Sequence, residues 1–445
     1  MFALAILIMG AVTLWRLPID GYLEPPFYFR VNETLMDLFE PAYWANNGGA
    51  YKIWHALYPP LSFIFLKALS IRECYVRGAA IARQCDWRSI LALIFVFCCN
   101  ILLVLRCYRL AVIPASISRT VAVCLGLPML YALERGNLLI PCFTCFVLAF
   151  GDIMRWRGAR WLAMALAINF KPYLVFSLLP FVGRRTWLGL IVLGLMFVSI
   201  YGLTYFIAGS GSPLEVIANE SRYAGVKSVQ YFSDLYFATS YWPLIRLLSA
   251  APSDLVLLPP GVALVVRLIL EIALRLAQCG FALCSAIALF RPSRVDIRRF
   301  GAMVACISLV AFTTGSAGYV QIFLFFLLFY EPWSGRVRIA ILSCAYVLCM
   351  PTDYVFLPFI HQRELSFLTG RSVIVESGVS IGQLLRPGLL LVIQYGLIVI
   401  NLIDLLTSSD RTLAAREPGW FSSLSSLNSS RPPGSQRPIA VPSEP

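Results

Sequence analysis

The residues whose types best suit chemistry lie in an acidic, aromatic stretch near the start of the chain, residues 18–57. This stretch contains Asp20, Glu24, Asp37 and Glu40. Asp37 is set in mostly apolar sequence, Met-Asp-Leu-Phe-Glu-Pro-Ala-Tyr-Trp. A carboxylate that is half desolvated at an interface binds a proton more tightly, which suits a general base. We therefore predict that Asp37 is the catalytic base and that Glu40 contacts the substrate; the alternative is a set of ordinary solvated loop acids.

Three residues further along the chain are suited to hold an anionic group. Lys171 lies in Ile-Asn-Phe-Lys-Pro-Tyr within apolar sequence, and Arg135 and Asn137 lie in Glu-Arg-Gly-Asn just before an apolar segment. A charge inside a membrane normally faces a cavity, a partner or an anionic ligand, and a helix N-terminus with an arginine is an anion site. The alternatives are a lysine that snorkels from a helix end and a helix cap with a local Glu134–Arg135 pair.

Three more polar residues are candidate substrate contacts. His55 and Tyr58 precede Pro59 and Pro60 and offer hydrogen bonds to a sugar or a phosphate. Gln321 follows Gly-Ser-Ala-Gly-Tyr-Val, where small residues let a substrate approach the backbone. The alternatives are an interfacial histidine and helix packing through glycine and serine.

The elements that position these residues are membrane-spanning helices. Of 445 residues, 59% are hydrophobic and 13% are charged, and the mean hydropathy is +0.77. A soluble domain has about 25% charged residues, so the chain is a polytopic membrane protein. One span needs about 20 apolar residues, and we predict an all-α protein of roughly ten to twelve spans. The clearest candidates are residues 1–17, 89–105, 137–154, 188–208, 262–290, 301–314, 319–330, 337–350 and 383–406.

Charge predicts the orientation of these spans. The net charge of +13 comes from arginines in short loops, the first such cluster being Arg72, Arg77, Arg83 and Arg88. The positive-inside rule places these loops in the cytoplasm and the acidic stretch on the opposite face. We predict a bacterial plasma membrane with the site facing the periplasm or exterior, and no nucleic-acid binding because the arginines do not gather on one soluble module.

Basic clusters flank residues 161–182 on both sides, with only about twenty residues between them. Pro172 weakens a continuous helix. We therefore predict a pair of short helices that bend at Lys171–Pro172, so that both clusters reach the same face.

Domain organisation is simple. Residues 1–406 form one transmembrane domain, with amphipathic helices expected in three outer segments, residues 18–57, 209–260 and 351–379. Residues 407–445 are rich in Ser and Pro and predict a disordered cytoplasmic tail. The 13 cysteines lie mainly in apolar segments, where thiols act as small hydrophobes. We expect no metal ion or cofactor.

Five sequence pieces in this order resemble a known family. They are Asp-Leu-Phe with a following Tyr-Pro-Pro-Leu, Gly-Asn, Asn-Phe-Lys-Pro-Tyr, Thr-Ser-Tyr-Trp-Pro-Leu-Ile-Arg-Leu-Leu, and Gly-Ser-Ala-Gly-Tyr-Val-Gln. Over residues 3–406 the chain is similar to the glycosyltransferase-C superfold, and nearest to glycosyltransferase family 87, the membrane mannosyltransferases with domain of unknown function 2029.

The resemblance implies an inverting glycosyltransferase. Its donor would be a polyprenyl-phosphate sugar, usually mannose, and its acceptor a lipid-linked sugar or glycan. Asp37 would be the base, with Asp20 and Glu40 as alternative acids. Lys171 and Arg135 would face the donor phosphate or form the wall of the site. Tyr58 and Asn137 would belong to the frame of the site.

Two other classes of protein remain open at this point. A transporter or flippase of lipid-linked glycans would need charged residues along a continuous path through several spans, and here the acids lie in loops. The second class is a non-catalytic membrane scaffold or a polysaccharide polymerase. A polymerase would be expected to use arginines in outer loops, such as Arg222, Arg246, Arg363 and Arg371.

Overall fold

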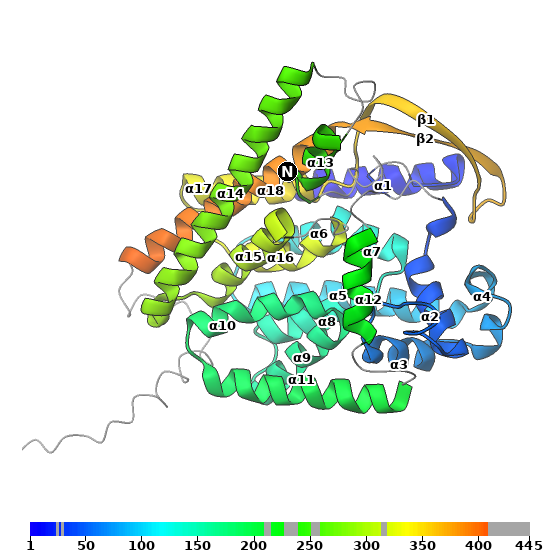
Figure 1. Cartoon of the computed structure of the whole chain (residues 1–445), viewed down its shortest axis with the longest axis horizontal. Helices are drawn as coiled ribbons and strands as arrows, with labels where there is room; N and C mark the ends of the chain where they lie inside the picture. Colours follow the sequence, from blue (N-terminus) through cyan, green and yellow to red (C-terminus); the bar gives the residue numbers. More distant parts are fainter. Residues whose placement is uncertain are drawn as a thin grey trace, which may run out of the picture.

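The computed structural model describes residues 1–23, 26–27, 31–208, 215–226, 239–250, 259–312 and 318–407. The described chain is mostly helical (Figure 1). Within it, five helices are long and apolar enough to cross a membrane, which is the signature of a helical membrane protein. They are α1 (Phe2–Asp20), α5 (Trp87–Leu110), the pair α6 (Ser116–Cys124) and α7 (Leu127–Arg135), α11 (Trp187–Ala208) and α18 (Ile381–Thr407).

The remaining helices are shorter or more polar. They are α2 (Met36–Asn47), α3 (Pro60–Leu69), α4 (Ala79–Cys85), α8 (Leu139–Phe150), α9 (Arg157–Phe170), α10 (Leu179–Gly183), α12 (Glu215–Val226), α13 (Trp242–Ala250), α14 (Pro260–Phe290), α15 (Ile297–Ile307), α16 (Gln321–Leu328) and α17 (Arg336–Leu348). Short 3₁₀ helices occur at η1 (Val31–Glu33), η2 (Arg72–Tyr75), η3 (Pro172–Leu178), η6 (Pro292–Arg294) and η8 (Gly318–Val320), and a short π-helix at η7 (Ser308–Phe312). Because many apolar helices here are too short to span alone, the count of ten to twelve spans stays a prediction.

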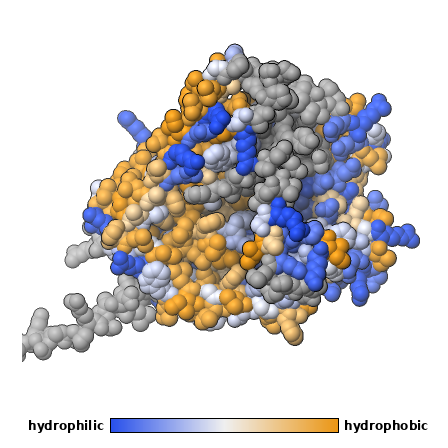
Figure 2. All heavy atoms as spheres, in the orientation of Figure 1, coloured by the Kyte–Doolittle hydropathy of each residue, from blue (hydrophilic) through white to orange (hydrophobic). Residues whose placement is uncertain are grey.

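Helix position follows from where the apolar residues lie. On α8, Phe143 and Phe146 are buried and pack against Phe323 and Phe326 of α16. A helix that is apolar all round belongs in the interior. By contrast, α11 leaves large apolar side chains such as Phe206 exposed, and Figure 2 shows a hydrophobic surface along that helix. Such a surface suits contact with lipid.

The bundle has two ends, which α8 separates. Asn137 precedes α8 and lies beside Asp37, whereas Asp152 follows α8 and pairs with Arg298 at 2.6 Å. Twelve residues at about 1.5 Å each put these points about 18 Å apart. We name them the Asp37 end and the Arg299 end. In Figure 1, α2, α4 and the tip of the β-hairpin lie at the right, and α10 and the end of α18 lie at the left.

The non-spanning stretch that follows α1 is longer than the sequence indicates. The apolar piece after Leu57 forms only the ten residues of α3, too few to cross a membrane. Arg83 on α4 donates to the backbone oxygens of Asn32 and Thr34 at 2.9 and 2.7 Å. The prediction that places Arg83 on the face opposite the acidic stretch is therefore wrong. A charge count cannot register an arginine that is buried against backbone carbonyls.

The predicted bend at Lys171–Pro172 is confirmed. Helix α9 ends at Phe170, Lys171 is extended, and η3 begins at Pro172. The residue before a proline is disfavoured in a helix. After the bend, Arg185 donates to the backbone oxygen of Leu289. Before it, Arg160 donates to the backbone oxygen of Met154, two residues after Asp152. Both flanking basic clusters therefore lie at the Arg299 end.

The third predicted outer segment forms a β-hairpin rather than a helix. β1 (Val355–Leu365) and β2 (Ser372–Ser380) pair antiparallel, from Val355 opposite Ser380 to Leu365 opposite Ser372. β-branched residues favour this geometry. Val375 is buried against Val31, whereas the next residue toward the tip, Ile374, is exposed. Helices do occur in the other two outer segments, as α2, α12 and α13. The predicted tail, residues 407–445, lies outside the described residues after Thr407.

Candidate active site

Asp37 lies in the first turn of α2, and both of its carboxylate oxygens have partners. Arg135 donates to Oδ1 and Asn137 donates to Oδ2, each at 2.7 Å. The Asp37 side chain remains 21% exposed. A carboxylate has about four lone-pair positions. The two contacts therefore fix the orientation of the carboxylate and leave each oxygen able to accept a further hydrogen bond.

A close approach between α7 and α2 creates this contact. Helix α7 ends at Gly136, which has a φ of 67°, and a Cβ there would lie 2.9 Å from the Cβ of Leu38. Glycine is thus required for both conformation and space. Leu35, also at positive φ (62°), donates its backbone N–H to the oxygen of Glu134. A leucine in that region is strained, and such strain often lies at functional sites.

Asn137 has two roles. Its Oδ1 accepts from the backbone N–H of Leu139 at 2.9 Å, at the start of α8, and its amide nitrogen donates to Asp37. The residue is 1% exposed. Because an amide carries both an acceptor and donors, a single side chain starts the helix and orients the carboxylate.

The surroundings of Asp37 are negatively charged. Arg135 also pairs with Glu33 at 3.3 Å, so one guanidinium holds two carboxylates. Partial burial, together with the charges of Glu33 and Asp37, raises the pKa of Glu40. The anion that occupies the predicted Arg135–Asn137 site is thus a side chain of the protein, Asp37. A free anion would meet repulsion here.

Lys171 and Tyr58 meet at a second position. The Nζ atom of Lys171 lies 4.5 Å from the centre of the Tyr58 ring. Phe170 packs edge-on against Phe65 of α3, with ring centres 5.5 Å apart. Helix α3 also packs against α2, which carries Asp37. The bend at Pro172 therefore presents a cation beside the helix pair that holds the candidate base.

Gln321 and His55 lie apart from both positions. Gln321 is 4% exposed at the start of α16 and lines a small cavity with Tyr131 and Arg386. His55 is exposed, has a φ of 49°, and contacts Arg222 of α12 at 3.0 Å. His55 therefore links the first and second outer segments. Of the predicted acids, Glu24 lies outside the described residues, and Asp20 is the last residue of α1.

Sequence reasoning missed a covalent clip beside the site. Cys74 and Cys85 form a disulfide that joins η2 to α4. Next to it, Tyr75 and Ser89 donate to Asp86 at 2.8 and 2.7 Å. The available signal was context, because these two cysteines lie in a polar stretch and most of the others lie in apolar segments.

Comparisons of the chain with protein-family models, with curated proteins and with solved structures give no match. Within the described ranges, no group of three or more His, Cys, Asp or Glu side chains is arranged to hold a metal ion.

Proposed function

We propose that the protein is an integral-membrane inverting glycosyltransferase that moves a sugar, mannose being favoured, from a polyprenyl-phosphate donor to a glycolipid or glycan acceptor. The observation that carries the proposal is the oriented, partly exposed carboxylate of Asp37, whose two oxygens are held by Arg135 and Asn137. A base must be fixed in place and still reachable by the substrate.

The proposed reaction uses a single base. Asp37 takes the proton of an acceptor hydroxyl while that oxygen attacks the anomeric carbon of the sugar. The bond from this carbon to the phosphate oxygen breaks, and the lipid phosphate leaves with the electron pair. Attack from the side opposite the leaving group inverts the anomeric carbon.

Lys171 is the better candidate for stabilising the leaving phosphate. Arg135 is engaged by Asp37 and Glu33, whereas Lys171 is half-buried over the Tyr58 ring. A cation at a developing negative charge lowers the barrier most when it is already in place. We therefore assign charge stabilisation to Lys171 and carboxylate orientation to Arg135.

The disulfide supports the proposed location. Disulfides persist in oxidising compartments and are rare in the cytosol, and Cys74–Cys85 lies at the Asp37 end with Arg83. This agrees with an active site that faces the periplasm or exterior of a plasma membrane. There it meets a lipid-borne donor and water at once.

The test is sugar transfer by purified protein. Wild type and Asp37→Asn are incubated with radiolabelled polyprenyl-phosphate mannose and a membrane lipid extract. Labelled product from wild type alone supports the proposal. No product with this donor or with other lipid-phosphate sugars contradicts it and favours a transporter of lipid-linked glycans.

A further inference from the structure

An apolar cavity lies next to the Asp37 cluster. Its volume is about 210 Å³, and its walls come from α1, the turn before α2, α7 and the hairpin tip. Leu14 of α1, Leu130 and Leu133 of α7, and Leu368 of the hairpin are among the lining residues. Helix α7 therefore contacts both the candidate base, through Arg135, and this cavity.

The size and position of the cavity suit a hydrocarbon chain. It is larger than the cavity of about 150 Å³ that holds a benzene molecule, and smaller than the roughly 300 Å³ at which drug-sized sites begin. One segment of a chain would fill it. Leu14 is 59% exposed, so the cavity borders the surface that α1 presents to lipid.

Among the described residues, one acidic group lines this apolar space. Glu134 is 9% exposed, and its Oε1 accepts from the hydroxyl of Thr34 at 2.9 Å. Its Oε2 is buried and has no hydrogen-bond partner within the described part of the chain. Buried polar atoms normally have partners, so an unpaired carboxylate oxygen at a cavity points to a ligand that donates a hydrogen bond.

We propose that this cavity takes the apolar chain of the sugar acceptor, a lipid whose neutral, hydroxyl-bearing head group meets Glu134. The inference rests on the proposed glycosyltransferase function and names its acceptor class. A glutamate side chain hydrogen-bonds a hydroxyl in either protonation state, and when ionised it repels a phosphate. Because Glu134 and Arg135 are consecutive on α7, a head group at Glu134 can place another hydroxyl near Asp37, while the donor phosphate stays with Lys171.

The first experiment is photolabelling with two probes that differ only in charge. Both carry a diazirine on the same alkyl chain; one ends in a neutral sugar and the other in a phosphate. Purified protein is irradiated with each probe, and the labelled peptides are mapped by mass spectrometry. We expect the neutral probe to label residues 10–17 or 130–134. The phosphate probe should label them at least fivefold less, which is about the effect of one unfavourable charge contact on binding. Equal labelling by both probes, or neutral labelling elsewhere only, overturns the proposal.

Two variants test the assigned residues. Leu14→Trp fills the cavity and should reduce neutral labelling severalfold, whereas Leu4→Trp on the same helix should leave it unchanged. Leu4 is a matched control because it is 62% exposed, close to Leu14, and does not line the cavity. Glu134→Gln should raise labelling by the phosphate probe toward that of the neutral probe. If the ratio of the two probes is unchanged, Glu134 does not select the head group.

Transfer kinetics separate this inference from the proposed function. Leu14→Trp should raise the acceptor KM with little change in donor KM. Photolabelling needs no turnover, so a protein that labels as expected but transfers no sugar contradicts the function and retains the cavity. A protein that transfers sugar but is labelled elsewhere supports the proposed function and contradicts the proposed role of the cavity.

Discussion

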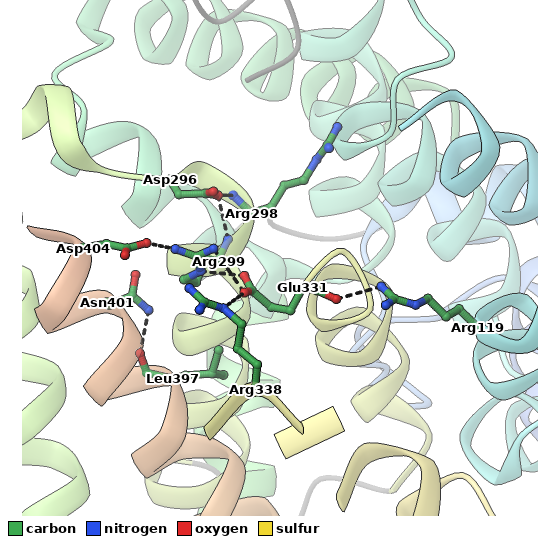
Figure 3. Close-up of polar contacts among 9 residues, drawn as sticks. All are labelled: Arg119, Asp296, Arg298, Arg299, Glu331, Arg338, Leu397, Asn401 and Asp404. Carbon is green, nitrogen blue, oxygen red and sulfur yellow. Dashed lines mark hydrogen bonds and ion pairs between the residues drawn. The ribbon is translucent and has the colours of Figure 1, made fainter. Parts of the chain in front are cut away.

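Two clusters of carboxylates and guanidinium groups lie at opposite ends of α8 and differ in their access to solvent. At the Arg299 end, Arg299 and Arg338 hold Glu331, and Asp404 pairs with Arg299 (Figure 3). The side chains of Arg299 and Glu331 are 5% and 6% exposed. At the Asp37 end, the Asp37 side chain is 21% exposed.

The two clusters differ in how many further hydrogen bonds their carboxylates can accept. Both oxygens of Glu331 accept from Arg299, at 2.5 and 3.1 Å, Arg338 adds a third contact, and Arg119 donates to its backbone oxygen. These groups join α6, α15, α17 and α18 into a clamp whose central carboxylate, Glu331, is saturated. The carboxylate of Asp37 instead keeps part of its surface accessible to solvent and lies near an apolar cavity. The same residue types therefore support structure where they are saturated and chemistry where they are reachable.

The largest expected effect is on catalysis at the Asp37 end. Asp37→Asn keeps the shape but removes the base, so kcat should fall about 10²- to 10⁴-fold while the unfolding temperature changes little. The measurement is radiolabel transfer by the folded protein. Asp20→Asn is the control, because Asp20 ends α1. An active Asp37→Asn with an inactive Asp20→Asn would reverse the assignment.

The next effect is on stability at the Arg299 end. Glu331→Gln leaves buried Arg299 and half-buried Arg338 without their shared carboxylate, which should lower the free energy of unfolding by about 3–5 kcal/mol. The specific activity of the folded fraction should stay within about twofold, a difference below 0.5 kcal/mol. Glu271→Gln is the matched control. Its pair with Arg267 is 32% and 39% exposed and should contribute less than about 1 kcal/mol.

A third prediction concerns the covalent clip, which only the Asp37 end has among the described residues. Replacing Cys74 and Cys85 by serine should lower stability by about 3 kcal/mol and reduce transfer, because Arg83 on α4 supports the turn before Asp37. Thermal unfolding and transfer are measured with and without a reducing agent. Cys98→Ser, at an exposed free cysteine, should change neither.

A smaller effect is expected on donor binding. Lys171→Met should raise the donor KM about tenfold, the value of one charge-assisted contact, with a modest change in kcat. Lys67→Met is the control, because Lys67 is exposed on α3. If Arg135→Met weakened donor binding more than it lowered kcat, Arg135 rather than Lys171 would contact the donor phosphate.

The smallest effect is a pH dependence at Glu40. Its pKa is raised in the folded protein, so folding disfavours the ionised form. Stability is therefore lost as pH rises through the folded pKa, and none is lost below the unfolded value of about 4.3. Glu40→Gln should be slightly more stable than wild type near pH 7 and equal near pH 4. Since Glu40 keeps much of its surface in contact with solvent, its partial burial has a small effect, and the difference should stay within about 0.5 kcal/mol. The measurement is thermal unfolding of both proteins between pH 4 and pH 7. A stability difference that grows toward low pH would contradict the prediction.

Local sequence rules were sufficient for some features. Apolar length indicated α1, α5, α11 and α18, because a helix in lipid must satisfy its own backbone hydrogen bonds. Pro172 indicated the bend, because proline lacks an N–H and restricts the residue before it. Placing Asp37 in a mostly apolar outer stretch likewise required only its immediate neighbours.

Features that depend on distant partners required the tertiary structure. Asp37 meets Arg135 and Asn137 across 98 and 100 residues, and Arg83 was assigned to the wrong face because a charge count does not include its backbone partners. The hairpin at 355–380 was unexpected because the sequence does not show which strand will pair with which.

The sequence by itself determined that this chain has the long apolar helices of a helical membrane protein and an acidic stretch after the first of them, since apolar length and charge are local properties. Only the tertiary structure decided which acid is oriented, which arginine is saturated and where a cavity remains. The physical reason is that the role of a charge depends on its partners and its exposure. Both are set by packing between segments far apart in the chain.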